Sequence, residues 1–417
     1  MKTRPLGWSA LEITPVGVGT APIGAARDWQ IWWGEQDPGA AVAAIQRALA
    51  LGVNWLDTAP FYGWGRAEEL VGEAIRGRRD GVLVFTKCGT FRDPLREDLR
   101  PESIRADLEA SLQRLGTDYV DLLQFHDPDP ATPIEESWGE LQRLVEEGKV
   151  RHGGLSNHPI DAVERAHVVA PVAAVQCQYS LLARDVEHDV LSFARHRRIG
   201  VLAWSPLASG FLTDGFDLEG LDEEDFRRRH PFAERERSGE IPRVRGALGE
   251  IARRRGASAA QVALAWVLRR PAVRGAIVGI RTPAEADALP LAAELELDDA
   301  DLAALDGRSS GDAGGYERGV ELIRSGDYFA AHEELEDAWR AAPGEERDFL
   351  QGLVHVAVAW YQAGRGRRIG TERQLEKAIR RLEPYAPEHR GLHLDPLLAQ
   401  LRELMERGSL DLPPPQL

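Results

Sequence analysis

The sequence predicts an α/β protein in which a (β/α)₈ barrel over residues 1–306 is followed by a small all-α helical domain. Three observations predict it. Short apolar runs recur along the first three-quarters of the chain, amphipathic helical patterns lie between them, and the periodicity after a Gly/Ser-rich segment is helical only. At 417 residues the chain exceeds one ordinary hydrophobic core, so we expect two domains.

The predicted barrel rests on eight apolar runs. Runs of this kind are typical of parallel strands buried on both faces. Eight such units favour a closed TIM barrel over an open sheet. No G-x-G-x-x-G motif follows a predicted strand, which removes the main support for an open dinucleotide-binding sheet. The predicted strands are 15–19, 53–57, 82–87, 120–126, 152–156, 174–179, 201–205 and 276–280, and the helical patterns between them include 40–50, 101–115, 133–147 and 247–268.

Two segments interrupt this regular pattern. Residues 213–242 are long, charged and rich in Arg and Glu, so they form either a lid over a site or a solvated insertion. Residues 307–315 (GRSSGDAGG) contain nothing to bury, which predicts a linker. A helical domain is then expected over 316–409, with Asp327 and Thr371 as helix N-caps and a disordered tail at 410–417. Its expected helices are 316–324, 328–340, 346–363, 371–382 and 396–407.

Composition excludes several classes of function. A net charge of −16 disfavours nucleic acid as a partner, because phosphate binding needs clustered positive charge. Cys88 and Cys177 lie in apolar runs, which predicts buried reduced thiols and a cytoplasmic setting. The N-terminus lacks an apolar signal core, and no stretch is long and apolar enough to span a membrane.

Ionisable residues end three of the predicted strands: Asp57, Lys87 and His126. The C-terminal ends of barrel strands converge on one mouth, so these side chains are expected to share a pocket. Lysine occurs only four times in the sequence, and Lys87 behind an apolar run is costly to bury unless it is paired. Asp57 is its natural partner. Tyr62 follows Asp57 by five residues, on the loop that leaves the same strand.

These four residue types suggest carbonyl reduction. A free tyrosine has a pKa of about 10, and an adjacent lysine ammonium lowers that pKa, so that Tyr62 acts as general acid or base. Asp57 keeps Lys87 charged and oriented, and His126 donates a hydrogen bond to the substrate oxygen. Each residue alone has an ordinary structural explanation, as a turn residue, a core polar group or a loop aromatic. Their joint occurrence at successive strand ends points to function.

Several ordered motifs resemble the aldo-keto reductase superfamily. They are LGVNWLDTAPFYGWGRAEELVGEAI, FTK, DYVDLLQFHDPD, VRHGGLSN, VQCQYS and AWSPLASGFL, and the resemblance as a whole covers residues 5–305. The first carries Asp57 and Tyr62 at the family's catalytic positions, and the next two supply Lys87 and His126. The resemblance implies reduction of aldehydes or ketones to alcohols, with NADP(H) as cofactor and a small-molecule carbonyl as substrate.

The resemblance also implies a set of cofactor contacts. Ser156, Asn157 and Gln176 are expected to hold the nicotinamide carboxamide, and Trp204 to stack on the nicotinamide ring. Ser205, Leu207 and Ser209 are expected to line the pyrophosphate. Arg281 is expected to contact the 2′-phosphate. The chain departs from the family at two positions: it has Glu285 where the family often has Gln, and Leu289 where the family often has Asn. NADP(H) remains the expected cofactor because Arg281 offers a bidentate phosphate contact, with NAD(H) as the alternative.

The sequence leaves the substrate, the oligomeric state and a second function class open. Trp29, Trp32, Trp33 and Trp64 follow the first two strands and either wall an apolar or sugar-stacking pocket or pack the loops. Some relatives of this fold are redox-sensing subunits of larger assemblies. The alternative to an enzyme is therefore a nicotinamide-binding redox sensor whose helical module binds a partner.

The C-terminal segment resembles the small helical DUF309 family over residues 316–383. The resemblance rests on the pattern HE-x-L-E-x-x-W, with His332, Glu333, Leu335, Glu336 and Trp339. His332 and Glu336 are one helical turn apart, and with His355 of the next helix they are candidate metal ligands. We expect a buried polar network without metal, because a metal site needs three protein ligands at defined geometry. Where the family tends to have a Tyr-His pair, this chain has Tyr361-Gln362, and the missing histidine is a further point against a metal site.

Overall fold

The computed structural model describes residues 1–187, 190–306, 315–342 and 344–417. The chain divides into two compact units, one of residues 1–186 and 193–307 and the other of residues 187–192 and 308–417. The predicted linker 307–315 lies outside the described residues except for Gly315, which begins a helix. Each unit is described by itself below.

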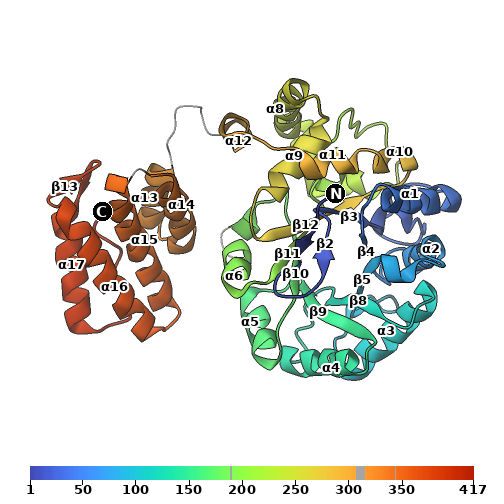
Figure 1. Ribbon diagram of the computed structural model, residues 1–417, viewed down its shortest axis with the longest axis horizontal. Coiled ribbons are helices and arrows are strands. Elements are labelled where there is room, and N and C mark those ends of the chain that lie inside the picture. The colour runs from blue at the N-terminus through green and yellow to red at the C-terminus, as the bar shows by residue number, and fades with distance from the viewer. Residues whose placement is uncertain (188–189, 307–314, 343) are drawn as a thin grey trace. The chain divides into compact units, whose positions relative to one another are not determined.

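The first unit is a closed barrel of parallel strands inside a ring of helices (Figure 1). Each strand pairs in parallel with its neighbours, and β12 pairs with β3 to close the barrel. The predicted fold class is confirmed, and all eight predicted strands are present. They are β3 (Val16–Gly19), β4 (Trp55–Asp57), β5 (Leu83–Cys88), β8 (Val120–Phe125), β9 (Val150–Ser156), β10 (Ala174–Gln178), β11 (Gly200–Trp204) and β12 (Val273–Gly279).

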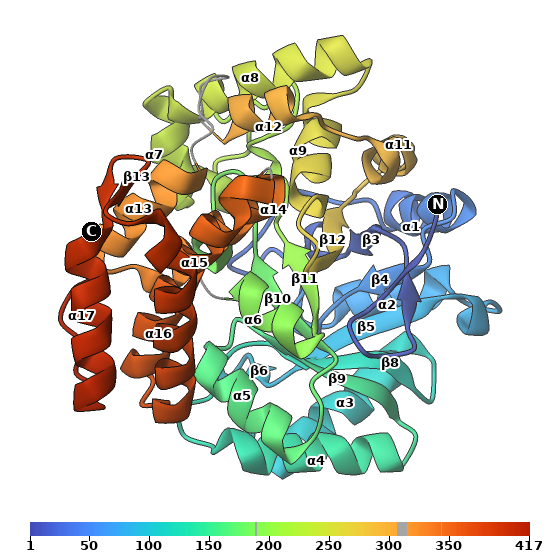
Figure 2. The ribbon, with the colours of Figure 1, turned by 60° about the vertical axis from the view of Figure 1, so that its left-hand side comes forward.

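Helices follow the strands and cover the outside of the barrel, as Figure 2 shows for α3, α4 and α5 beside β8 and β9. Local chemistry sets several of their ends. Asp37 caps α1 by accepting a hydrogen bond from the Ala40 amide at 2.7 Å, and Gly116, with φ at 64°, ends α3. The helices are α1 (Pro38–Ala50), α2 (Arg66–Ala74), α3 (Pro101–Leu115), α4 (Ile134–Glu146), α5 (Ile160–Val169), α6 (Val190–Arg197), α9 (Ala259–Leu268), α10 (Pro283–Ala286), α11 (Leu289–Glu294) and α12 (Asp299–Leu305).

The helical pattern predicted over 247–268 is two helices rather than one. Helix α8 (Glu240–Arg255) ends at Gly256, where φ is 63°, and α9 begins after Ser258. Ser258 and Gln261 form a capping box, in which each side chain accepts a hydrogen bond from the other residue's backbone amide. The periodicity of apolar residues runs through this break, so it did not reveal the break.

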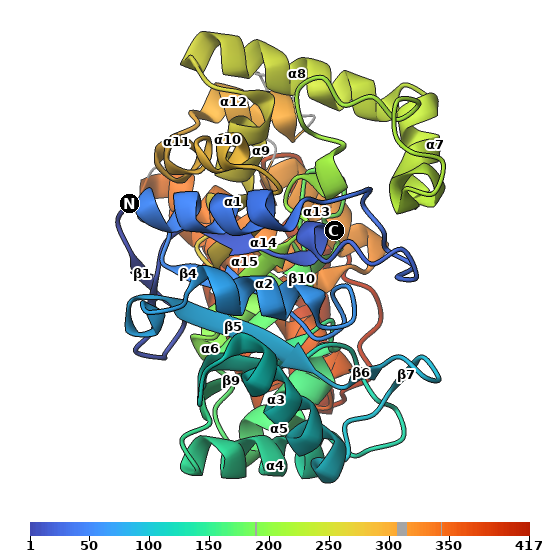
Figure 3. The same cartoon turned by 90° about the vertical axis from the view of Figure 1, so that its right-hand side faces the viewer.

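Short helices occupy the charged segment 213–242. They are the 3₁₀ helix η5 (Phe226–Arg229), α7 (Pro231–Arg237) and the first turn of α8. Helices α7 and α8 are labelled in Figure 3. The same figure shows a separate feature, the hairpin of β6 (Thr90–Phe91) and β7 (Arg96–Glu97), which continues beyond the end of β5. That the segment acts as a lid stays a prediction.

A tryptophan fills the end of the barrel interior that lies opposite the strand C-termini. Trp55 of β4 is fully buried, and its indole nitrogen donates to the Thr14 carbonyl at 2.9 Å. Gly17 of β3 and Gly275 of β12 leave the space that this ring occupies, because a Cβ on Gly17 would lie 2.1 Å from it and one on Gly275 2.6 Å from it. The hairpin of β1 (Arg4–Pro5) and β2 (Glu12–Ile13) precedes β3 in the chain.

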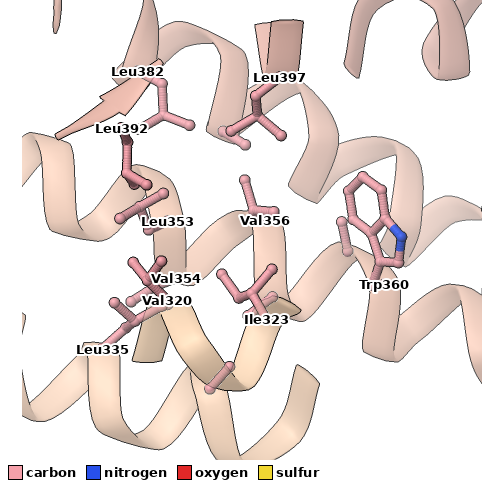
Figure 4. Packing of buried hydrophobic residues seen from close by; sticks show 14 of the residues in the cluster. Val320, Ile323, Leu335, Leu353, Val354, Val356, Trp360, Leu382, Leu392 and Leu397 are labelled. Atoms are coloured by element: carbon pink, nitrogen blue, oxygen red, sulfur yellow. The ribbon is translucent and has the colours of Figure 1, made fainter. Parts of the chain in front are cut away.

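The second unit is a helical domain with one hydrophobic core, to which Val320, Leu335, Leu353 and Leu397 contribute (Figure 4). Its helices are α13 (Gly315–Ser325), α14 (Tyr328–Ala341), α15 (Gly344–Gly364), α16 (Arg368–Leu382) and α17 (Leu394–Arg407). Asp327 caps α14 as predicted. Thr371 is not an N-cap, because α16 begins three residues earlier and the Thr371 hydroxyl donates to the Arg367 carbonyl at 3.0 Å.

The tail 410–417, which the sequence predicts to be disordered, packs on the helical core instead. Leu412 and Leu417 contact that core. The Trp360 indole donates to the Pro413 carbonyl at 2.8 Å, and the Gln400 amide donates to the Pro414 carbonyl at 2.9 Å. Prolines lack a backbone donor, but their carbonyls remain good acceptors. A short hairpin of β13 (Glu388–His389) and β14 (Leu392–His393) was also not predicted.

The two cysteines are buried free thiols, as predicted. Burial raises the pKa of Cys88 well above its usual value, and the nearby Asp107 adds to this. Among the helices that the structure describes, none combines the length and the hydropathy needed to cross a lipid bilayer.

Replacing Gly17 by alanine tests the packing of the barrel interior. We expect Gly17→Ala to lower the free energy of unfolding by about 1–3 kcal/mol, because the new methyl group overlaps the Trp55 ring. Gly139→Ala is the matched control: Gly139 lies in α4 with nothing within 4 Å of its added Cβ, so this change is expected to stabilise by up to about 1 kcal/mol. Urea denaturation followed by circular dichroism measures both, and equal stability of the two variants would contradict the packing.

Candidate active site

The four predicted catalytic side chains come from one side of the barrel. Asp57 ends β4, Lys87 lies near the end of β5, and His126 follows β8 directly. These strands are neighbours in the order β4-β5-β8, and Tyr62 lies on the loop after β4. The parallel topology therefore brings together at one mouth residues that are far apart in sequence.

Lys87 is the centre of the site. Its ammonium donates to Asp57 Oδ1 at 2.5 Å, to the Thr58 carbonyl at 3.1 Å and to the Tyr62 hydroxyl at 3.1 Å. The side chains of Lys87 and Asp57 are each 1% exposed, so the ion pair is out of solvent. All three donors of the ammonium are used. Lys87 thus links a buried carboxylate to the phenol that the sequence assigns as proton donor.

Two glutamines satisfy the other oxygen of Asp57. Gln176 of β10 donates to Asp57 Oδ2 at 2.9 Å, and Gln124 of β8 donates to the same atom at 3.2 Å. The Gln176 amide also donates to Gln124 Oε1 at 2.9 Å. The sequence analysis missed Gln124. Its signal was a polar residue inside a buried strand, two positions before His126 and therefore on the same face.

His126 lies edge-on to two aromatic rings beside the site. Its ring centroid is 5.7 Å from that of Tyr62 and 5.6 Å from that of Phe61, with interplanar angles of 86° and 85°. The buried Nδ1 has no hydrogen-bond partner in the described part of the chain. A buried polar atom without a partner is costly, and a bound molecule that supplies one removes that cost.

Burial sets the direction of the pKa shift for Tyr62 and His126, but not for Lys87. It raises the pKa of Tyr62 above its usual value, and Lys87 opposes this without reversing it. The sequence argument predicted a net lowering, and this is corrected: it considered the lysine charge and left out desolvation. Burial and then Lys87 hold the pKa of His126 well below its usual range. Burial is also the largest single influence on the pKa of Lys87 and acts to lower it. The charges of Asp57 and Tyr62, together with the hydrogen bonds to both residues, outweigh burial, so the pKa of Lys87 is raised.

Aromatic residues surround Tyr62. Trp29, Ala59 and Phe61 form a buried cluster, against which Trp33 and Trp64 pack together with Tyr62. Of the four tryptophans considered from the sequence, Trp29 and Trp32 are almost fully buried. Packing of the loops after β3 and β4 therefore accounts for much of this aromatic content.

The ends of β9 and β11 adopt strained backbone conformations. Asn157 has φ at 57°, and in the turn after β11 Ser205, Ala208 and Ser209 have φ between 50° and 56°. Left-handed conformations are uncommon for residues other than glycine and cluster at ligand sites. Trp204 donates from its indole to Asn157 Oδ1 at 3.0 Å, so the two strand ends are in contact.

These strand ends fit the nicotinamide contacts that the resemblance implies. Ser156 is buried at the end of β9, and Gln176 joins this region to Asp57. The Ser209 amide donates to Ser205 Oγ at 2.9 Å, which fixes the turn that also contains Leu207. With the unpartnered His126 Nδ1 beside Tyr62, the residues present suit a group that brings its own hydrogen-bonding atoms.

Arg281, the residue assigned to the 2′-phosphate, follows β12 and is engaged with the protein. Its guanidinium donates to the Trp33 carbonyl at 2.9 Å, to the Glu35 carbonyl, and to Gln36 Oε1 at 2.9 Å. Glu285 accepts from the Arg281 amide at 2.5 Å and belongs to the capping box of α10. Leu289 is 2% exposed and packs inward. Glu285 thus has a structural role in capping, and Leu289 has one in packing.

The helical domain brings His332 and Glu336 together, with His332 Nε2 3.9 Å from Glu336 Oε1. No group of three His, Cys, Asp or Glu side chains in the described residues is arranged to hold a metal ion, so His355 does not complete one with this pair. Burial lowers the pKa of His355 to about 4.

Removing the Gln124 amide tests how the Asp57 carboxylate is held. We expect Gln124→Leu to lower the free energy of unfolding by about 1–3 kcal/mol, because a buried carboxylate oxygen loses a donor. Gln113→Leu, at an exposed position of α3, is the matched control and is expected to change stability by less than about 0.5 kcal/mol. Chemical denaturation compares them, and a Gln124→Leu protein as stable as the control would contradict the network.

Comparison with known proteins agrees with this geometry. Residues 15–309 match the Aldo/keto reductase family, and residues 316–374 match the Domain of unknown function (DUF309). The chain is 36% identical over 297 residues to Aldo-keto reductase YhdN of Bacillus subtilis (strain 168), which covers 69% of this chain and 88% of that protein. It is 34% identical over 270 residues to Probable aldo-keto reductase 1 of Glycine max, covering 64% of this chain and 76% of the relative.

Solved structures agree as well. The glycerol dehydrogenase AKR11B4 from Gluconobacter oxydans superposes with a TM-score of 0.67 at 32% identity, over 73% of this chain and 94% of that one. Both resemblances stated from the sequence are confirmed. The chain is an oxidoreductase that belongs to the aldo/keto reductase family and has a DUF309 domain after its barrel.

Proposed function

We propose that the barrel reduces aldehydes or ketones to alcohols with NADP(H), and that Tyr62 is the proton donor. The observation that carries the proposal is the Lys87 ammonium, which contacts both the buried Asp57 carboxylate and the Tyr62 hydroxyl. Members of the family use nicotinamide cofactors, and the strained turn after β11 with Trp204 at its start supports such a cofactor here. The substrate is a small-molecule carbonyl compound.

A bound nicotinamide would supply the hydride, or accept it in the reverse reaction. The protein's own residues manage the proton. The Tyr62 hydroxyl donates to the substrate oxygen as negative charge develops there. Lys87 stabilises the phenolate that remains, and Asp57 keeps Lys87 charged. His126 is neutral, because its pKa is lowered, and its ring orients the substrate oxygen through a hydrogen bond.

The cofactor would be held by the residues at the ends of β9 to β12. Arg281 favours NADP(H), because a guanidinium binds phosphate with two parallel hydrogen bonds. NAD(H) is the alternative, since neither Glu285 nor Leu289 offers a contact to the adenosine end. The residues proposed to hold the nicotinamide and pyrophosphate are Ser156, Asn157, Gln176, Trp204, Ser205, Leu207 and Ser209.

Tyr62→Phe separates an enzyme from a sensor. We expect this change to lower the turnover of carbonyl substrates by about 10²–10⁴-fold, because the proton donor is gone. NADPH binding, followed by fluorescence titration, should stay intact. The substrate panel includes glyceraldehyde, since one solved relative is described as a glycerol dehydrogenase.

Tyr119→Phe, just before β8 and so at the opposite end of that strand from His126, is the matched control and should keep wild-type turnover. If Tyr62→Phe also kept it, the assignment of Tyr62 would be wrong. A wild-type protein that binds NADPH but turns over no carbonyl of the panel would favour the redox sensor.

Lys87→Met tests the electrostatic coupling to Tyr62. The lysine charge lowers the pKa of Tyr62, so removing it is expected to raise that pKa further and to move tyrosinate formation to higher pH. The measurement is the ultraviolet tyrosinate titration of Lys87→Met and of the wild type, each corrected with its Tyr62→Phe counterpart. Carbonyl reduction should be lost. Identical titrations in the two backgrounds would contradict the coupling.

A second variant guards this test against unfolding. Lys87→Met leaves a buried, unpaired carboxylate, which costs about 3–5 kcal/mol. The double variant Asp57→Asn/Lys87→Met replaces the ion pair by neutral groups, and we expect it to recover much of the stability without recovering activity.

A further inference from the structure

The segment 33–36, in the loop between β3 and α1, is fastened to Arg281 across the closure of the barrel. Arg281 donates to the carbonyls of Trp33 and Glu35 and to the Gln36 side chain. The Gln36 amide in turn donates to the Arg281 carbonyl at 3.1 Å. Gln36 and Arg281 are therefore joined by two reciprocal hydrogen bonds. We call this arrangement the clasp, meaning residues 33–36 together with Arg281.

The clasp depends on a glycine and is braced by the segment that follows β11. Gly34 has φ at 91°, a region that favours glycine, and it lies directly beside the guanidinium, since an added Cβ would be 3.8 Å from Arg281 Nη1. The centroids of the Phe226 and Trp33 rings are 4.7 Å apart, and the Arg227 guanidinium carbon lies 5.0 Å from the Trp33 ring centroid. The segment 33–36 is thus contacted by both Arg281 and η5.

The clasp occupies three of the five N–H donors of the Arg281 guanidinium. Its partners in the described chain are two carbonyl oxygens and one amide oxygen, all of them neutral. Arg227 adds a second positive charge nearby, although that residue is paired with Asp225 at 2.6 Å. Charge-assisted bonds to phosphate are stronger than bonds to neutral acceptors, so a phosphate competes well for these donors.

The geometry points to a competition at Arg281 between the clasp and the 2′-phosphate of the dinucleotide, with Gln36 as the residue that sets its balance. This rests on the proposed function, in which Arg281 receives the 2′-phosphate. A dinucleotide that lacks the 2′-phosphate leaves the clasp closed, whereas one that carries it competes with the neutral acceptors for the donors that they occupy on Nε, Nη1 and Nη2. Gln36 is therefore a specificity-determining residue that lowers the preference for phosphorylated cofactor.

The test uses the full chain and two small probes of the adenosine end. Adenosine 2′,5′-bisphosphate carries the 2′-phosphate and adenosine 5′-monophosphate does not, and isothermal titration calorimetry measures both. We expect Gln36→Ala to tighten the bisphosphate about 5-fold, the worth of one neutral hydrogen bond, and to leave the monophosphate within about 2-fold of wild type. Gly34→Ala, which strains the segment at its positive φ, should shift the ratio of affinities in the same direction.

Gln46→Ala, at an exposed position of α1, is the matched control and should leave both affinities unchanged. Weaker bisphosphate binding by Gln36→Ala would overturn the proposal, because Gln36 would then orient Arg281 for the phosphate. An unchanged ratio would overturn it as well. If the wild-type protein bound neither probe, the proposed cofactor site itself would be wrong. If the probes bound but Gln36→Ala left the ratio of affinities unchanged, only the competition at Arg281 would be wrong, and the proposed carbonyl reduction would be unaffected.

Discussion

The ion pair of Lys87 with Asp57 is the constraint on which the rest of the site depends. Both side chains are 1% exposed, and two charges removed from water are tolerated only with good geometry and with all remaining hydrogen bonds made. The Thr58 carbonyl, the Tyr62 hydroxyl, Gln124 and Gln176 provide those bonds. Strands β4, β5, β8 and β10 therefore contribute to one polar network.

The same burial that makes the ion pair costly shapes the chemistry of Tyr62. Desolvation raises the pKa of the phenol, and the lysine charge recovers only part of the shift. The hydroxyl therefore keeps its proton near neutral pH, which suits a donor in carbonyl reduction. In the proposed reaction Lys87 matters most when charge moves onto the phenol oxygen, because an ammonium already in place stabilises that charge without reorganisation.

The two ends of the barrel differ in the residues that occupy them. At the N-terminal ends of the strands, Trp55 fills the space that Gly17 and Gly275 leave. At the C-terminal ends, backbone strain accompanies polar side chains, which are exposed at Asn157 and half-buried at Ser205 and Ser209. Strain of this kind persists only where the surrounding structure enforces it, and here the closed sheet provides that rigidity.

The sequence by itself determined the strands, most of the helices and the gathering of ionisable residues at one barrel mouth. Period and composition identify buried parallel strands, and a closed parallel barrel puts every strand end at the same mouth, so Asp57, Lys87 and His126 had to meet. Only the tertiary structure decided the partners of Arg281, the place of Gln124, the sign of the pKa shift at Tyr62 and the packing of the tail. These depend on contacts between loops far apart in the chain, and on how deeply each group is buried. Neither the contacts between distant loops nor the depth of burial of a single group produces a periodic pattern in the amino-acid sequence.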